Sequence, residues 1–209
     1  MGLFNFPLFA SETKEATFWR WFQKNDERLF SFEKDREKTF DSLAEILKKV
    51  NPNLTFEFGP IVTGSKREFV ISAGGIRSAF PAVEALHAAA PQMPKWIFIK
   101  FRARRTSIND LEYSGVKVRA KDVNYILFKD ENPEKVGILI FIDGYTKERK
   151  STFGQIGYLF LDEALGEYDV EMKVGAIQFE SRESKYFERS HPLPELPQAF
   201  DEHFGSKKE

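Results

Sequence analysis

The chain has 209 residues, 42% of them hydrophobic and 15% aromatic, enough to bury one large core or two small ones. Its 31 Lys and Arg residues nearly balance 32 Asp and Glu residues, which argues against a general affinity for nucleic acid or anionic membranes. Cysteine is absent and the three histidines are not at metal-ligand spacing, so disulfides, cysteine nucleophiles and thiolate metal sites are excluded. We therefore expect neither a metal nor a cofactor.

The N-terminal residues do not read as a targeting signal. Segment 1–15 is apolar but lacks the basic region and the small-residue cleavage site of a secretory signal. Phe6 stands where a myristoylation motif requires Ser or Thr. No apolar run approaches the ~20 residues of a membrane span. These features predict a cytoplasmic protein with no membrane partner.

Two amphipathic helices are expected first, over about 11–50. Ser11 has the chemistry of an N-cap, and the helix that it opens runs to residue 24 or as far as 31. Residues 36–50 place apolar side chains at i, i+3, i+4 and i+7, and Asn51-Pro52 ends this second helix. The sheet-containing core is expected to follow, over 53–180.

The core reads as two successive sets of strand, strand, helix and strand. The first set has strands at 54–58, 68–72 and 95–103 and a helix at 76–90, with Gly59-Pro60 ending the first strand. A polar connection follows at 104–116. The second set has strands at 117–128, 135–142 and 170–179, a helix at 150–165 ended by Gly166, and a bulge near Gly175-Ala176.

The pattern predicts an α+β fold with a mixed, largely antiparallel sheet covered by helices. The strand at 135–142 is apolar on both faces and should lie inside the sheet. We expect one domain over 1–180, followed by a charged, Pro-containing tail over 181–209 with a short helix near 197–204. The repeated pattern is either a structural duplication or a common layout of α+β proteins, since sequence identity between the halves is negligible.

The strand at 95–103 carries the first candidate site. Alternation places one set of aromatic and cationic side chains on a single face: Trp96, Phe98, Lys100, Arg102 and Arg104. No acid occurs between Glu84 and Asp110 to neutralise it. The face is either a solvated strand end above core aromatics or a binding surface for an acidic protein or anionic small molecule. Nucleic acid is disfavoured because the Gly-rich pattern of RNA-binding modules is absent.

The second candidate is an acidic group at the end of the 150–165 helix and just beyond it: Asp162, Glu163, Glu167, Asp169 and Glu171. The helix macrodipole disfavours Asp162 and Glu163 in a last turn, so a compensating cation is expected. We expect Lys100, Arg102 and Arg104 to supply it through ion pairs. The alternative is a hydrolase that uses these carboxylates, although their spacing matches no known metal motif.

Four segments of the sequence resemble segments of other proteins: PNLTFEFG (52–59), REFVISAGG (67–75), FPAVEALHAAAPQMPKWIFIKFR (80–102) and LGEYDVEMKVGAIQF (165–179). They resemble bacterial proteins with no assigned activity, over most of residues 15–180. The resemblance implies a bacterial cytoplasmic protein and transfers no catalytic residue. Together these features favour a non-catalytic ligand- or protein-binding module over an enzyme, with the hydrolase as the alternative.

Overall fold

The computed structural model describes residues 12–62 and 65–205, and the chain forms two compact units, Met1–Lys100 and Phe101–Glu209. This division differs from the single domain expected over 1–180. The α+β class is confirmed, and four of the six strand pairs in the described residues are antiparallel. Within those residues, none of the helices combines the length and apolar character that crossing a bilayer requires.

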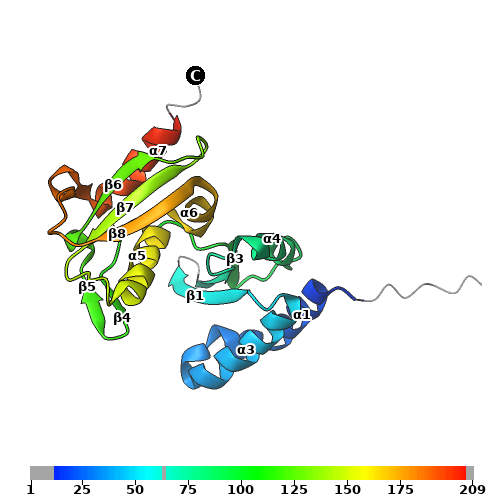
Figure 1. Cartoon of the computed structure of the whole chain (residues 1–209). Coiled ribbons are helices and arrows are strands. Elements are labelled where there is room, and N and C mark those ends of the chain that lie inside the picture. The colour runs from blue at the N-terminus through cyan, green and yellow to red at the C-terminus, as the bar shows by residue number, and fades with distance from the viewer. Residues whose placement is uncertain (1–11, 63–64, 206–209) are drawn as a thin grey trace, which may run out of the picture. The chain divides into compact units, whose positions relative to one another are not determined.

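The N-terminal unit begins with helices α1 (Lys14–Lys24), α2 (Asp26–Phe30) and α3 (Arg36–Val50) (Figure 1). The Thr13 hydroxyl caps α1 by accepting the N–H of Ala16 at 3.1 Å. Ser11, which we expected as the cap, lies outside the described residues. The expected 36–50 helix is confirmed by α3.

A three-stranded sheet follows, with strand order β1-β2-β3. Its strands are β1 (Thr55–Val62), β2 (Lys66–Ser72) and β3 (Trp96–Lys100), and α4 (Phe80–Ala88) joins β2 to the parallel β3. β1 does not end at Gly59-Pro60 as expected. It continues through an irregularity in register between Phe58 and Ile61, which an edge strand tolerates because the missing N–H of Pro60 faces no partner.

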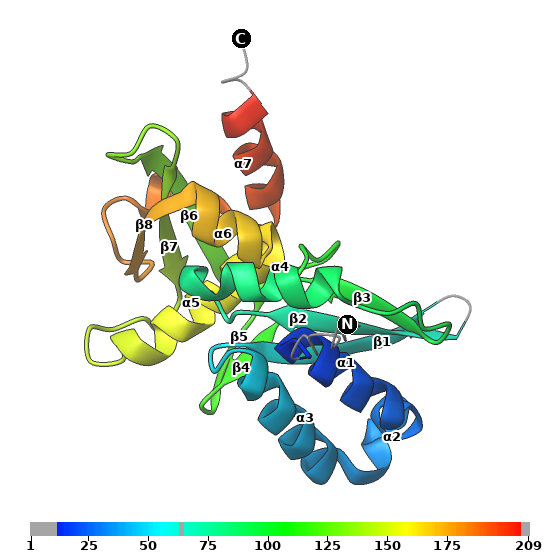
Figure 2. The same ribbon diagram turned by 90° about the vertical axis from the view of Figure 1, so that its right-hand side faces the viewer.

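The core of the N-terminal unit is mainly aromatic. Phe18 and Phe22 of α1 are fully buried against Phe69 of β2, with ring centroids 6.4 and 5.0 Å from that of Phe69. Phe40 of α3 contacts Phe56 of β1 at 5.3 Å, so α1 and α3 pack on the same side of the sheet (Figure 2). The many phenylalanines of the sequence are therefore used for packing.

The C-terminal unit is built on a second sheet of order β8-β7-β6-β9. A short hairpin, β4 (Leu111–Tyr113) and β5 (Val116–Val118), precedes this sheet where a polar connection was expected. The sheet strands are β6 (Val123–Lys129), β7 (Val136–Ile142), β8 (Val174–Glu180) and β9 (His191–Pro192). The expected strand at 117–128 is therefore divided between β5 and β6.

β7 is internal, as predicted. All seven of its residues are buried, because Phe153 and Phe160 of α5 (Lys150–Leu165) belong to the core on one face and Phe187 packs against Phe141 on the other. Gly166 ends α5 with φ of 80°, as predicted. The predicted bulge is also present, since β7 and β8 shift in register between Val136 and Ile138.

Two expectations about the end of the chain are wrong. Val170 lies in a helix, α6 (Glu167–Lys173), and β8 begins only at Val174. The helix forms because Glu167 and Asp169 fall in its first turn, where the macrodipole favours anions. The folded unit also extends past residue 180, where the tail was expected to begin: α7 (Leu196–Gly205) confirms the expected helix near 197–204, and three side chains of the described tail residues are completely buried, Leu193, Leu196 and Phe200.

Both units contain the same arrangement of strands. In each, two antiparallel strands are followed by helix and then by a strand parallel to the second: β1-β2-α4-β3 and β6-β7-α5-α6-β8. The second strand of each set is the central one. The repeat predicted from the sequence pattern therefore extends to strand order and direction.

Candidate functional site

The two aromatic residues of the first candidate site belong to the core of the N-terminal unit. Trp96 is 4% exposed, and its indole Nε1–H donates to Asp26 Oδ1 over 2.5 Å. The ring of Phe98 contacts that of Trp19 at a centroid distance of 4.6 Å. Trp96 is therefore buried and Phe98 is half-buried among other aromatic side chains, in agreement with the structural alternative.

The cationic residues do not continue along the strand. Phe101 has φ of 61°, which ends β3 at Lys100 and breaks the alternation on which the two-faced strand was based. Lys100 lies in the N-terminal unit, with Nζ 4.0 Å from Glu84 Oε1, so our expectation that it would contact the acidic group is wrong. Arg102 and Arg104 lie in the C-terminal unit, after the break.

The expected pairing of both arginines with the acidic group is confirmed. Arg102 Nη1 lies 3.4 Å from Asp162 Oδ2, and Arg104 Nη2 lies 2.7 Å from Asp169 Oδ2. Arg104 Nη1 also lies 2.8 Å from Asp201 on α7. The predicted cationic row is therefore neutralised, and its arginines join the segment after β3 to α5, α6 and α7.

Two further acids of the group, Glu163 and Glu167, bind main-chain groups of the same segment. Glu163 Oε2 accepts the N–H of Asn109 at 2.7 Å, and Glu167, fully buried, accepts the N–H of Arg102 at 3.1 Å. Burial raises the pKa of Asp162 to about 6, against the opposing effect of Arg102. These contacts give the carboxylates a role in positioning the chain. Among the described residues, no group of three or more His, Asp or Glu side chains could hold a metal ion.

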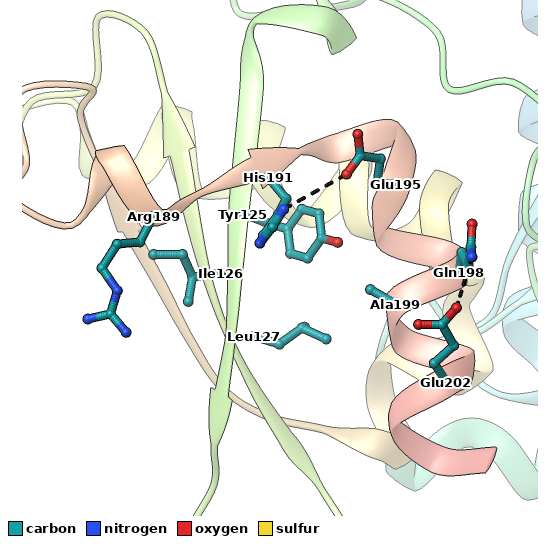
Figure 3. Close-up of a pocket in the computed structure, with 9 residues that line it drawn as sticks. All are labelled: Tyr125, Ile126, Leu127, Arg189, His191, Glu195, Gln198, Ala199 and Glu202. Atoms are coloured by element: carbon teal, nitrogen blue, oxygen red, sulfur yellow. Dashed lines mark hydrogen bonds and ion pairs between the residues drawn. The ribbon is translucent and has the colours of Figure 1, made fainter. Parts of the chain in front are cut away.

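A different part of the C-terminal unit offers a cavity. A hollow of about 520 Å³ lies beside β6, below the point where β9 pairs with it, and α7 forms its opposite wall (Figure 3). We call it the β6 notch. Its lining residues come from β6, β9, η5 (Leu193–Glu195), α7 and the turn before β9: Tyr125, Ile126, Leu127, Arg189, His191, Glu195, Gln198, Ala199 and Glu202.

The notch lies against an uncovered strand edge. β9 pairs with β6 only through His191 with Tyr125 and Pro192 with Asn124. Because Pro192 has no N–H, only the His191–Tyr125 pair can exchange both main-chain hydrogen bonds. Main-chain groups alternate in direction along a strand, so the N–H and C=O of Leu127 point to the same side of β6 as those of Tyr125. Among the described residues, no strand pairs with β6 there beyond Tyr125.

Tyr125 brings a polar group into the notch. Its side chain extends from β6 toward α7 (Figure 3), and the residue is 2% exposed. Within the described residues its hydroxyl has no hydrogen-bond partner. Burial first, and then the charges of Glu195 and Glu202, raise the pKa of the Tyr125 phenol. Both glutamates line the notch together with Tyr125.

The two sides of the notch differ in charge. On the α7 side, Gln198 Nε2 donates to Glu202 Oε1 at 2.8 Å, and Glu195 Oε2 lies 3.9 Å from His191 Nδ1. Arg189 lies on the opposite side of β6, beside Ile126 (Figure 3). Its guanidinium has no ion-pair partner in the part of the chain that the structure describes. A ligand in the notch would meet carboxylates on one side and a guanidinium on the other.

Two other hollows lie near the sheet. One of about 440 Å³ continues from the notch along β6 and shares Leu127 with it; its other lining residues are Phe128, Lys129, Asp130, Pro133, Lys135, Val136 and His203. Another, of about 670 Å³, lies between α5 and the edge strand β8, where Tyr158 is 42% exposed. The β6 notch combines an open strand edge with a tyrosine hydroxyl directed into it.

Sequence reasoning missed the notch because its residues come from two distant segments. Tyr125 sits in an ordinary strand pattern, and residues 189–202 fall in the segment that was expected to be a charged, Pro-containing tail. The signal present was helical spacing, since Leu193, Leu196 and Phe200 fall at i, i+3 and i+7. Comparisons with protein-family models, curated proteins and solved structures find no match to the chain.

Proposed function

We propose that the protein is a non-catalytic binding module and that the β6 notch is its ligand site. The observation that carries the proposal is the Tyr125 hydroxyl, which is directed into the notch and has no hydrogen-bond partner among the described residues. A hydroxyl that lines a hollow and has no partner in the protein is available to bond to a ligand. A ligand with a complementary polar group would satisfy this hydroxyl, and the uncovered edge of β6 would supply further main-chain donors and acceptors.

The groups around the notch support binding rather than catalysis. Its lining contains no Ser, Thr, Cys or Lys that a neighbouring base could activate as a nucleophile. The one His–Glu pair, His191 with Glu195, is open to solvent, with side chains 64% and 62% exposed, and so lacks the enclosed environment in which catalytic acid–base pairs usually lie. The hydrolase alternative has less support, because the carboxylates from Asp162 to Asp169 contact arginines and main-chain N–H groups.

The expectation of an acidic partner rested on an unpaired cationic row. Since Arg102 and Arg104 contact carboxylates, we do not extend that expectation to the proposed site. The bacterial cytoplasm remains the proposed location, on the resemblance of four sequence phrases and the lack of cysteine.

The test is a ¹H–¹⁵N NMR screen of the full chain against a library of small amines, carboxylic acids and neutral amides. We expect the largest amide shifts at Tyr125, Leu127 and Ala199. Ala199→Trp, which fills the notch, should abolish them, whereas Ala85→Trp on an exposed position of α4 should not. Shifts confined to the hollow between α5 and β8, or no shifts at all, would contradict the proposal.

A further inference from the structure

We infer that the ligand of the β6 notch is a peptide segment in extended conformation. It adds to the edge of β6 below β9 and places a Lys or Arg side chain against Tyr125, Glu195 and Glu202. The inference rests on the proposed function, and it specifies the chemical class of the ligand that this site would take.

The strand edge supports the extended conformation. β9 would continue along β6 past Tyr125, but the chain instead turns away through η4 (Phe187–Arg189), whose last N–H bonds to Tyr186 O at 3.1 Å. Ile126 to Lys129 therefore remain without a neighbour on that side among the described strands. A strand rises about 3.3 Å per residue, so about four residues of a peptide would fit along this edge. Main-chain hydrogen bonds would then supply affinity that is independent of sequence.

The hollows on the α7 side run along the same part of β6 as the uncovered strand edge. The notch and the adjoining hollow of about 440 Å³ share Leu127, and together they follow β6 from Tyr125 to Lys129. Leu127 and Phe128 are only partly buried there. An added strand would cover these apolar side chains as well as the open main-chain groups. The length of the cavity thus matches the length of the uncovered edge.

The charge distribution selects a cationic side chain. Glu195, at the end of η5, and Glu202, on α7, both line the notch, and both raise the pKa of Tyr125 through their charge. An ammonium or guanidinium between them would donate to the carboxylates and to the Tyr125 hydroxyl, which has no partner among the described residues. An anion at this point would be repelled by both carboxylates.

The side chains on the opposite side of β6 indicate which peptide residue should flank the cation. Side chains alternate along a strand, so residues flanking the cation would face Ile126 and Arg189. Arg189 has no ion-pair partner in the described residues, and a carboxylate there would pair with it. The notch therefore favours a basic residue next to an acidic one. Specificity would come from these two side chains and affinity from the strand edge.

The first experiment uses a positional-scanning library of hexapeptides with acetylated N-termini and amidated C-termini. Fluorescence polarisation against the full chain should show enrichment of Lys or Arg at one position and of Asp or Glu at an adjacent one. For the best peptide, N-methylation of alternate residues should weaken binding at least tenfold in one register and leave it nearly unchanged in the other, because only one set of N–H groups faces β6.

The second experiment changes the protein. The double variant Glu195→Gln/Glu202→Gln should weaken binding of the best peptide at least tenfold, whereas Glu134→Gln, an exposed acid outside the notch, should leave it unchanged. Leu127→Pro should also abolish binding while preserving the fold, because the N–H that proline removes points away from β7. Should that variant unfold, the N-methylated peptides still test the strand edge.

The outcomes separate this inference from the proposed function. If amine or amide fragments shift the notch residues but no peptide binds, or if bound peptides show no preference for Lys or Arg, the peptide inference fails and the binding module stands. If N-methylation weakens peptide binding equally in both registers, strand addition is wrong. If peptides bind equally well to Ala199→Trp, both the inference and the proposed site fail.

Discussion

The ring of Phe179 on β8 lies directly over Gly157 of α5, where a Cβ at position 157 would fall well inside van der Waals contact with three ring carbons. Gly154, one turn earlier on the same helix, would bring its Cβ no closer than 3.9 Å to that ring. The two glycines are therefore alike in sequence but not in packing: one is required by the close approach of helix and strand, and the other is not.

Gly157→Ala should lower the free energy of unfolding by about 1–3 kcal/mol, because the added methyl group forces Phe179 or α5 to move. Gly154→Ala is the matched control and should be neutral or stabilising by up to about 1 kcal/mol, since alanine favours helix and meets only an ordinary contact. Urea denaturation followed by circular dichroism measures both. Equal effects of the two substitutions would show that α5 and β8 are not packed through Gly157.

Asp26→Ala should destabilise the N-terminal unit by about 1–3 kcal/mol. It removes the acceptor of the Trp96 Nε1–H, and the indole is too buried for water to replace that acceptor easily. Asp26→Asn retains a side-chain oxygen and should lose less. Glu45→Ala, at an exposed position of α3, controls for removal of an acid and should change little. Tryptophan fluorescence during urea denaturation reports the transition, and an effect no larger than that of the control would contradict the buried hydrogen bond.

Asp162→Asn should alter the dependence of stability on pH. The pKa of Asp162 is raised from 3.8 to about 6 in the folded protein, chiefly by burial. A raised carboxyl pKa contributes stability that is complete below about pH 3.8 and is lost as the pH rises through about 6. The wild type should therefore lose stability relative to Asp162→Asn between pH 4 and pH 7, by at most about 3 kcal/mol. Melting temperatures across this range test it, and a difference independent of pH would show that Asp162 does not titrate there.

Phe200→Ala should destabilise the C-terminal unit by about 3–5 kcal/mol, because Phe200 is fully buried in its core. Phe204→Ala, which removes a partly buried ring from the same helix, should cost clearly less. Limited proteolysis of the wild type should also spare residues 190–205. Early removal of α7 with retention of a folded core would contradict the packing described above.

The sequence by itself determined the elements whose patterns are long and local. Helices α3 and α5 follow the predicted ranges 36–50 and 150–165, because apolar spacing over several turns leaves one face to bury. β7 is central because a strand apolar on both faces has no side to offer water. The pairing of Arg102 and Arg104 with acids was also predictable, since cations without nearby acids and acids at a helix end compensate each other.

Only the tertiary structure decided where short elements end and which distant residues meet. Alternation could not reveal that Phe101 adopts a left-handed conformation, which separates Lys100 from the arginines and divides the chain into two units. The notch depends on β9, a strand of two residues, pairing with part of β6 from far along the chain. Pairing of that kind is set by burial of Leu193, Leu196 and Phe200 in a common core, a long-range effect that leaves little periodic trace in the sequence.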